Sequence, residues 1–309
     1  MKALVRQRFV MAFALVLGLA LVLAGCGGSS GSGGGSSAAP SSSAPSSEAP
    51  SSSAPASEPA ASASASPESG NLLEEIKSRG ALRVGLMGTY PPYNFMNDQN
   101  EFDGFDVDIA KEVAKRIGVG VEFVAQEFSG MIAGLQAKKF DVVISQMTIT
   151  EERKQQMDFS QPYITNEVRI IVHESNDTIT KLEDFKGKKI GVGLGTNDEK
   201  YLREVVLPKV GEFTIQTYDD VIFSLKDLDA RRIDATINNV YALKPVIERN
   251  GFKIKAVGEP VKSDQAGIAM RKGNPELLAA IDQALTDMKA DGTYDAIFNK
   301  WFGEASGAQ

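Results

Sequence analysis

The sequence contains one cysteine and one histidine among its 309 residues, and this scarcity excludes several kinds of site. One cysteine cannot form a disulfide within the chain, and one histidine without a cysteine cluster does not supply the ligands of a zinc site. No cofactor is therefore predicted. Basic residues are also fewer than acidic residues, which gives a formal net charge of −7. Nucleic-acid phosphates require a basic surface, so no nucleic-acid partner is predicted.

The single cysteine, Cys26, follows an N-terminal segment with the pattern of a secretory signal. The first eight residues carry only positive charge, an apolar run follows, and small residues precede Cys26. The four residues LAGC resemble the bacterial lipobox, which implies removal of residues 1–25 and attachment of a lipid to the Cys26 sulfur. An ordinary signal peptide or an uncleaved anchor helix is the alternative.

Residues 27–70 consist of Gly, Ser, Ala and Pro with three Glu. Such a composition cannot bury a hydrophobic core, so these residues are predicted to form a disordered tether that starts at Cys26. The N-terminal part as a whole predicts a protein outside the cytoplasm, lipid-anchored to the cell membrane, on a cell surface or in a periplasm.

From Asn71 onward, strand and helix patterns alternate. In FDVDIAKEVAKRIG, for example, apolar residues recur every four positions and Gly118 ends the helix pattern. This alternation predicts an α/β fold with mainly parallel sheets. The pattern occupies roughly residues 80–165 and restarts over residues 175–257, so two α/β lobes are predicted.

The end of the chain is too short for a third domain, and we expect it to pack against the first lobe. The first lobe is then predicted to comprise residues 71–166 and 264–309, and the second lobe residues 167–263. This arrangement requires two strands that cross between the lobes and act as a hinge. Ligands of open α/β sheets bind at the carboxyl ends of strands, so a ligand cleft is expected between the lobes.

The stretch ISQMTITEER places hydroxyl groups and an arginine where a strand ends and a helix begins. Thr150 is predicted to be the helix N-cap, with Arg153 at the third helical position. A cation is ordinarily unfavourable there, but the planar guanidinium matches a carboxylate and would bind a small anion. Pairing of Arg153 with an acidic side chain on the surface is the alternative, and the spacing alone does not decide between them.

Five stretches of the sequence closely resemble the extracytoplasmic solute-binding proteins (family 3) of polar amino acid ABC transporters: LRVGLMGTYPPYNFMNDQNEFDGFDVDIAKEVAKRIG, FSGMIAGLQAKKFDVVISQMTITEER, DFSQPY, LEDFKGKKIGVGLGTNDE and DGTYDAIFNKWFG. The resemblance covers residues 72–303. It implies a two-lobe periplasmic-binding-protein-like fold (type II) with two hinge strands, which closes on an amino acid ligand. It also implies an ABC transporter permease as partner and no enzyme activity.

On the first lobe, the resemblance implies five ligand contacts. Arg153 would bind the ligand α-carboxylate together with Thr148. Gln146 would lie where a backbone carbonyl accepts a hydrogen bond from the α-ammonium group. Tyr90 and Phe128 would pack against the ligand side chain, although both residues could instead belong to the hydrophobic core.

On the second lobe, the backbone N–H groups of Gly195, Thr196 and Asn197 would bind the same carboxylate at a helix start. The family usually has an aspartate for the α-ammonium group at the position of Asn239. An amide oxygen there still accepts a hydrogen bond but carries no charge. Asp198 is therefore predicted as a replacement acid.

Met87 occupies a position where relatives that bind cationic amino acids typically have an acid. A thioether there favours a neutral or sulfur-containing ligand, such as cystine or glutamine. The sequences of residues 131–146 and 191–197 most resemble the cystine-type branch of the family.

Two other functions were weighed against delivery of an amino acid to a permease. An enzyme on the same fold, of a dehydratase-like kind, would need a general acid or a nucleophile in the cleft. His173 has no nucleophile motif nearby and is expected to be exposed, and Glu127 and Asp198 have no obvious partner. A sensor module would have to signal through a separate receptor. The protein is expected to be a monomer.

Overall fold

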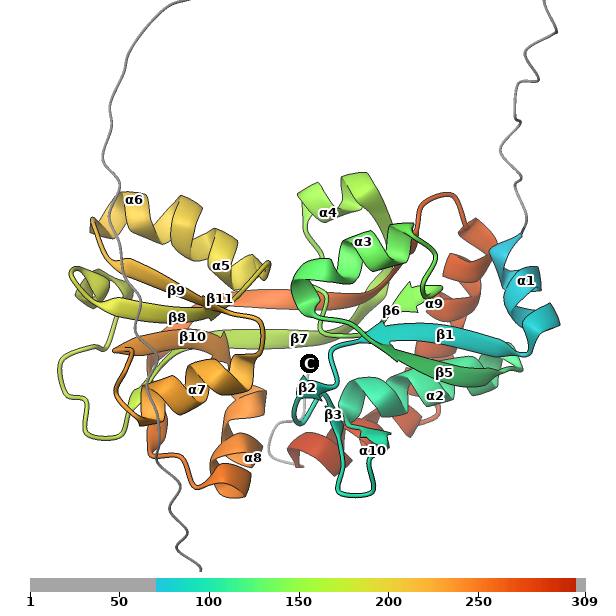
Figure 1. Cartoon of the computed structure of the whole chain (residues 1–309). Helices are drawn as coiled ribbons and strands as arrows, with labels where there is room; N and C mark the ends of the chain where they lie inside the picture. Colours follow the sequence, from blue (N-terminus) through green and yellow to red (C-terminus); the bar gives the residue numbers. More distant parts are fainter. Residues whose placement is uncertain (1–70, 304–309) are drawn as a thin grey trace, which may run out of the picture. The chain divides into compact units, whose positions relative to one another are not determined.

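A computed structural model describes residues 71–303 of the chain (Figure 1). The predicted signal peptide, the lipid attachment at Cys26 and the predicted tether lie outside these residues. Within the described part, no helix is both long and apolar enough to span a membrane.

Helices flank the strands throughout the described chain (Figure 1). They are α1 (Leu72–Arg79), α2 (Phe105–Ile117), α3 (Met131–Gln136), α4 (Glu151–Gln156), α5 (Asn197–Tyr201), α6 (Leu207–Val210), α7 (Val221–Asp229), α8 (Val240–Asn250), α9 (Pro275–Ala290) and α10 (Thr293–Phe302). Short 3-10 turns occur at Phe128–Gly130 and Leu182–Phe185, and a π-helix, Leu202–Val206, joins α5 to α6.

Local sequence signals explain where two of these helices begin or end. α2 ends at Gly118, which adopts the left-handed conformation with φ of 89° and donates its N–H to two carbonyls of the last turn. α4 begins after Thr150, whose Oγ1 accepts a hydrogen bond of 3.2 Å from the backbone N–H of Arg153. Both boundaries confirm the predictions from the sequence.

The strands form one sheet of eight and a separate sheet of three. They are β1 (Ala81–Leu86), β2 (Thr89–Tyr90), β3 (Asn94–Met96), β4 (Phe102–Asp103), β5 (Gly120–Ala125), β6 (Val142–Val143), β7 (Met157–His173), β8 (Lys189–Gly193), β9 (Thr214–Tyr218), β10 (Ala235–Asn239) and β11 (Ile254–Arg271). The order in the large sheet is β5-β1-β6-β11-β7-β10-β8-β9, and the small sheet is antiparallel β2-β3-β4.

The two long strands β7 and β11 join the halves of the large sheet (Figure 1). The group β5-β1-β6 is parallel, as is the group β10-β8-β9, and we call the halves built on these groups the first and second lobes. β7 and β11 pair with each other antiparallel and continue through both halves. The sequence analysis had treated FKIKAVG and AGIAM as separate strands, but both belong to the single strand β11. The exact lobe boundaries stay a prediction.

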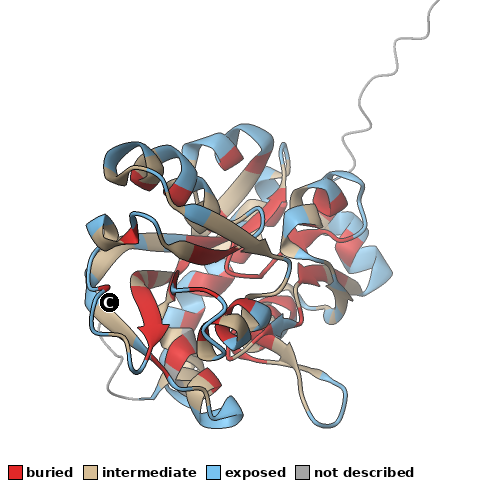
Figure 2. Cartoon of the chain, turned by 60° about the vertical axis from the view of Figure 1, so that its left-hand side comes forward, coloured by how far each residue is buried: buried red, intermediate tan, exposed pale blue. Residues whose placement is uncertain are grey.

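Each lobe has its own hydrophobic core. In the first lobe, α2, α9 and strand β1 contribute Ile109, Ile281 and Val84 to one buried cluster. In the second lobe, buried residues of β8 and β10, such as Ile190 and Ile237, form another. Buried positions follow the strands and the inner helix faces, whereas outer helix faces are exposed (Figure 2). Each lobe therefore has the buried apolar contacts of a separately packed unit.

Candidate functional site

A cavity of about 60 Å³ lies between the two lobes. Nine of the eleven residues predicted to bind a ligand line it, all except Arg153 and Gly195: Met87, Tyr90, Phe128, Gln146, Thr148, Thr196, Asn197, Asp198 and Asn239. One water molecule needs about 10–15 Å³ measured in this way, so the cavity has room for a small polar group rather than a large side chain. Their roles in binding stay predictions, but the structure brings these residues to one place.

The lobes contact each other directly around this cavity. Tyr90 Oη on β2 donates a hydrogen bond of 2.6 Å to Asn238 Oδ1 on β10. Glu152 on α4 forms an ion pair with Lys200 on α5. The structure is thus a closed arrangement, in which first-lobe and second-lobe residues share the cavity wall.

Arg153 is buried at the edge of the cavity, with 8% of its surface exposed. Its Nη1 donates to the Thr148 carbonyl at 3.0 Å, and its Nη2 donates to the Gly195 carbonyl of the second lobe at 3.3 Å. The guanidinium carbon lies 5.5 Å from the ring centre of Phe128, a cavity residue. Arg153 does not line the cavity but faces an adjoining hollow of about 340 Å³, which shares Thr196 and Asn197 with it.

The alternative of a surface ion pair for Arg153 is wrong. The acidic residues next to it are engaged elsewhere, because Glu151 pairs with Lys154 and Glu152 pairs with Lys200. Burial lowers the pKa of Arg153 below its ordinary value, although the carboxylates of Asp264, Glu152 and Asp198 act in the opposite direction. A buried guanidinium bonded to carbonyls alone carries a positive charge that a nearby anion would balance.

The side chain of Gln146 is directed into a buried hydrogen-bond network. Its Nε2 donates to Asp106 Oδ1 at 2.6 Å, and its Oε1 accepts from Asn166 Nδ2 at 2.8 Å. The backbone has a positive φ of 52°, and its N–H donates to Tyr163 Oη at 3.1 Å. These bonds fix the turn that carries the chain from β6 to Thr148. The predicted role of the Gln146 carbonyl stays a prediction.

Asp106 lies at the centre of this network and is fully buried. Besides Gln146, Asn94 Nδ2 donates to it at 2.7 Å and Tyr163 Oη at 3.0 Å. Burial raises the pKa of Asp106 to about 6, and the hydrogen bonds from Asn94, Gln146 and Tyr163 limit the increase. Asp106 is not recognisable as a network centre from the sequence, because a carboxylate in the first turn of α2 has the pattern of an ordinary helix start.

The predicted row of amide groups at the start of α5 is only partly available. The Gly195 N–H donates to Glu199 Oε2 at 2.8 Å, and the Thr196 N–H donates to the Gly193 carbonyl at 3.4 Å. Thr196 also caps the helix, since its Oγ1 accepts from the Glu199 N–H at 3.1 Å. The side chain of Asn197, by contrast, points to an acid on the crossing strand β11.

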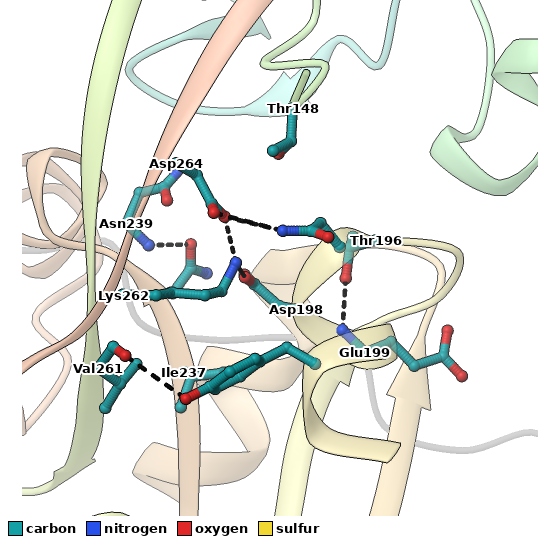
Figure 3. A network of polar contacts seen from close by, with 12 residues as sticks. Thr148, Thr196, Asp198, Glu199, Ile237, Asn239, Val261, Lys262 and Asp264 are labelled. Atoms are coloured by element: carbon teal, nitrogen blue, oxygen red, sulfur yellow. Dashed lines mark hydrogen bonds and ion pairs between the residues drawn. The ribbon is translucent and has the colours of Figure 1, made fainter. Parts of the chain in front are cut away.

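That acid is Asp264, which the sequence analysis did not single out. Asp264 lines the cavity and accepts hydrogen bonds from Asn197 and from Lys262 (Figure 3). Lys262 also forms an ion pair of 2.8 Å with Asp198. Asp198 therefore lies in the cavity wall, as predicted for a replacement acid, but it is already paired with a lysine.

Two further asparagines line the cavity, one from β7 and one from β10. Asn166 has 2% of its surface exposed and accepts from Tyr93 Oη at 2.9 Å. Asn238 accepts from the N–H of Asn239 at 2.7 Å. The only signal for these asparagines in the sequence is a polar residue within an apolar strand pattern, which also fits an exposed edge.

Tyr90 belongs to the first-lobe core and also lines the cavity, so its two alternative roles are compatible. Met87 lines both the cavity and an outer hollow of about 690 Å³, and so does Asp219.

The expectation that His173 is exposed is wrong. It is buried at the end of β7, with Nδ1 2.8 Å from Ser175 Oγ. Over residues 71–303, no group of three side chains could hold a metal ion.

The family model of bacterial extracellular solute-binding proteins, family 3, matches residues 82–304. The chain belongs to this family. The two-lobe fold class predicted from the sequence is confirmed, because the chain superposes on solved structures of amino-acid-binding proteins.

Known solute-binding proteins are similar to this chain over most of their length. The L-cystine-binding protein TcyJ of Escherichia coli (strain K12) is 41% identical over 233 residues, which is 75% of this chain and 86% of that protein. The histidine-binding periplasmic protein of the same strain is 35% identical over 228 residues, 72% of this chain and 87% of that protein. The solved structure of an ancestral arginine-binding protein bound to arginine is 45% identical, with a TM-score of 0.69 over 73% of this chain and 99% of that chain. These relatives are binding proteins, and this solute-binding protein is not an enzyme.

Asp106→Asn is expected to change how stability depends on pH. The folded-state pKa of Asp106 is raised from 3.8 to about 6, so the folded protein binds the extra proton. The stabilisation from this residue is fully present below pH 3.8 and is lost as the pH rises through about 6, and between pH 4 and pH 7 it falls by roughly 2 kcal/mol. In urea unfolding, the free energy of unfolding of the variant relative to that of the wild type should rise by about this amount between pH 4 and pH 7.

A stability difference between the two proteins that stays constant over this pH range would contradict the assignment. The dependence of the unfolding free energy on urea concentration should be the same for both proteins, which would show that the same surface is exposed on unfolding.

Proposed function

We propose that the protein captures an amino acid in the cavity between its lobes and delivers it to an ABC transporter permease. One observation carries the proposal. The buried cation Arg153 has carbonyl partners only, and the carboxylates of Asp198 and Asp264 lie in the wall of the neighbouring cavity. A zwitterion needs such a separation of positive and negative charge.

The carboxylate of the ligand would bind on the Arg153 side. Arginine has five N–H donors, and the observed bonds of Arg153 to carbonyls use Nη1 and Nη2. Thr148 and Asn197 line the cavity next to it and supply further donors. A small shift of the guanidinium from the adjoining hollow would let it reach a carboxylate in the cavity, with Phe128 as the surface on which it rests.

The ligand would be a neutral or sulfur-containing amino acid, such as cystine or glutamine. The relatives are named for L-cystine, histidine and arginine, which share only the main-chain groups of an amino acid. Met87 and Asp219 lie where the cavity meets the outer hollow, and Met87 occupies the position at which relatives that bind cationic amino acids typically have an acid. A long ligand side chain would leave the cavity past Met87, since the cavity itself holds little more than main-chain groups.

Closure would follow from bending of β7 and β11. The pairing of these strands has register shifts between Val257 and Lys262 and around Gly267, where regular hydrogen bonding is interrupted. A ligand that contacts both lobes favours the closed arrangement in proportion to its differential affinity. The permease could then recognise the closed form.

The protein would act outside the cytoplasm, as a monomer held at the cell membrane by a lipid on Cys26. The basic start, apolar run and LAGC sequence support this location. Residues 27–70 would give the binding lobes reach from the membrane surface toward the solute.

A melting-temperature screen tests the proposal. The purified full chain would be heated with each of the common amino acids, with L-cystine and with their deaminated analogues. A ligand at about 100 times its Kd stabilises the folded state by about 2.7 kcal/mol, which corresponds to about 5–10 °C for a protein of this size. At least one amino acid should raise the melting temperature, and no shift with any of them would refute the proposal.

Arg153→Ala is expected to weaken binding of the ligand found in that screen by about 2–5 kcal/mol, because one partner of a buried charge pair is removed. Titration calorimetry gives the affinity. Arg232→Ala is the matched control, since Arg232 pairs with Asp227 on the surface of the second lobe and does not line the cavity. Equal affinities of the Arg153 variant and the wild type would exclude a carboxylate contact.

Cys26→Ala is expected to release the protein from the membrane. In bacterial cells that produce the full chain, the wild type should sediment with membranes and carry a labelled fatty acid. The variant should lose the label and appear in the soluble or secreted fraction. Ser29→Ala serves as the control, and an unlabelled wild-type protein would rule out the lipid anchor.

A further inference from the structure

Three charged side chains form a compact cluster on the second-lobe side of the cavity (Figure 3). We call Asp198 of α5 with Lys262 and Asp264 of β11 the acid–lysine cluster. Lys262 pairs with Asp198 at 2.8 Å and also with Asp264. The side chains are 12% exposed for Lys262, 18% for Asp198 and 14% for Asp264, so the charges are largely shielded from water. Both carboxylates line the cavity.

Neighbouring groups hold the cluster in place. Asn197 Nδ2 donates to both oxygens of Asp264 at 3.3 Å. Lys262 Nζ lies 5.7 Å from the ring centre of Tyr201, whose hydroxyl reaches the Val261 carbonyl at 3.5 Å. Burial lowers the pKa of Lys262, but the charges of Asp198 and Asp264 outweigh this and raise it, so Lys262 is a cation. The carboxylates therefore keep a fixed geometry before any ligand arrives.

The charges of the cluster do not cancel. One lysine serves two carboxylates, which leaves one negative charge, while Arg153 on the other side has no acidic partner in the described residues. The negative charges of Asp264 and Asp198 both raise the pKa of Arg153, and the charge of Asp264 has the larger effect. A zwitterion between the two sides would pair every charge with an opposite one.

We propose that Asp264 binds the ammonium group of the ligand, in place of the acid that is missing at Asn239. The inference rests on the proposed function and assigns this contact to a residue of the crossing strand β11. Lys262 positions Asp264, and Asp198 serves as the second partner of Lys262 rather than as the ammonium acceptor.

The position of Asp264 in the sheet favours it over Asp198. Its backbone neighbour across the strand pair is Asn166, another cavity residue, and two residues further along β11, Ala266 bridges to Thr148. In Figure 3 Thr148 lies above Asp264. The ammonium and carboxylate groups of an amino acid share one carbon atom, so the acid nearest to the Thr148 and Arg153 side is the one that can reach the ammonium.

Calorimetry with two pairs of probes tests the assignment on the full chain. L-glutamine is compared with glutaramate, and L-cystine with 3,3′-dithiodipropionate, because each second compound lacks the ammonium groups. Asp264→Asn should weaken binding of the amino acids by about 10- to 100-fold, the loss of a charge-assisted bond. The deaminated probes should change by less than about threefold, as should all probes with the control variant Asp227→Asn, because Asp227 pairs with Arg232 and does not line the cavity. Asp198→Asn should weaken amino acid binding less than Asp264→Asn does.

Equal losses for both members of a pair, or a larger selective loss in Asp198→Asn, would overturn the assignment. Asn239→Asp provides a test that leaves the cluster intact. If Asp264 already binds the ammonium, the added acid should improve amino acid binding by less than about threefold. A gain of tenfold or more would show that the ammonium lacks an acidic partner and would also overturn it.

The outcomes separate the two proposals. A wild-type protein that binds none of these probes, and no other amino acid, refutes amino acid capture and the assignment together. A wild-type protein that binds an amino acid while Asp264→Asn shows no preference between the paired probes refutes the assignment alone.

Discussion

The antiparallel pairing of β7 with β11 is the constraint on which the rest of the structure depends. Each of these strands also pairs with the parallel strands of one lobe. β11 pairs with β6 in the first lobe, and β7 pairs with β10 in the second. The same pair passes the cavity, where it contributes Asn166 and Asp264 to the wall. Since the strands that join the lobes also supply cavity residues, the proposed bending of these strands would change the site itself and not only the distance between its halves.

Burial of charge is the second constraint, and it explains why the cavity is polar on both sides. A guanidinium or carboxylate removed from water costs several kcal/mol unless opposite charges and hydrogen bonds compensate. Lys262 compensates Asp198 and Asp264 within the acid–lysine cluster, whereas Arg153 makes side-chain hydrogen bonds to carbonyls and no ion pair among residues 71–303. In the proposed hinge motion, opening of the lobes would let water reach Arg153 and so make the unequal compensation tolerable. Closure without an anion would be the costly state.

Features set by neighbouring residues could be predicted from the sequence, and features set by distant strands could not. The N-cap Thr150 and the end of α2 at Gly118 depend on side chains within one helical turn. The continuity of β11 depends on pairing with β7, almost a hundred residues away, and an interrupted apolar pattern concealed it. Lys262 and Asp264 alternate with other residues in a polar stretch, which looks like an exposed edge until the strand is placed against α5. The ligand roles of the predicted residues came from family resemblance, and spacing alone left Arg153 undecided.

The contacts between the lobes set a limit on what a ligand must supply. Tyr90 bonds to Asn238, Glu152 pairs with Lys200, and the guanidinium of Arg249 on α8 lies 5.3 Å from the ring centre of Phe95 on β3. None of these contacts requires a ligand, so each lowers the free energy of the closed arrangement by itself. A ligand shifts the equilibrium only by its differential affinity for the two arrangements. If these contacts were too strong, the protein would close empty and the cavity would be inaccessible. The exposed, solvent-screened ion pair of Glu152 and Lys200 contributes little, so among the charges at the lobe contact the buried ones have the larger influence on the proposed closure.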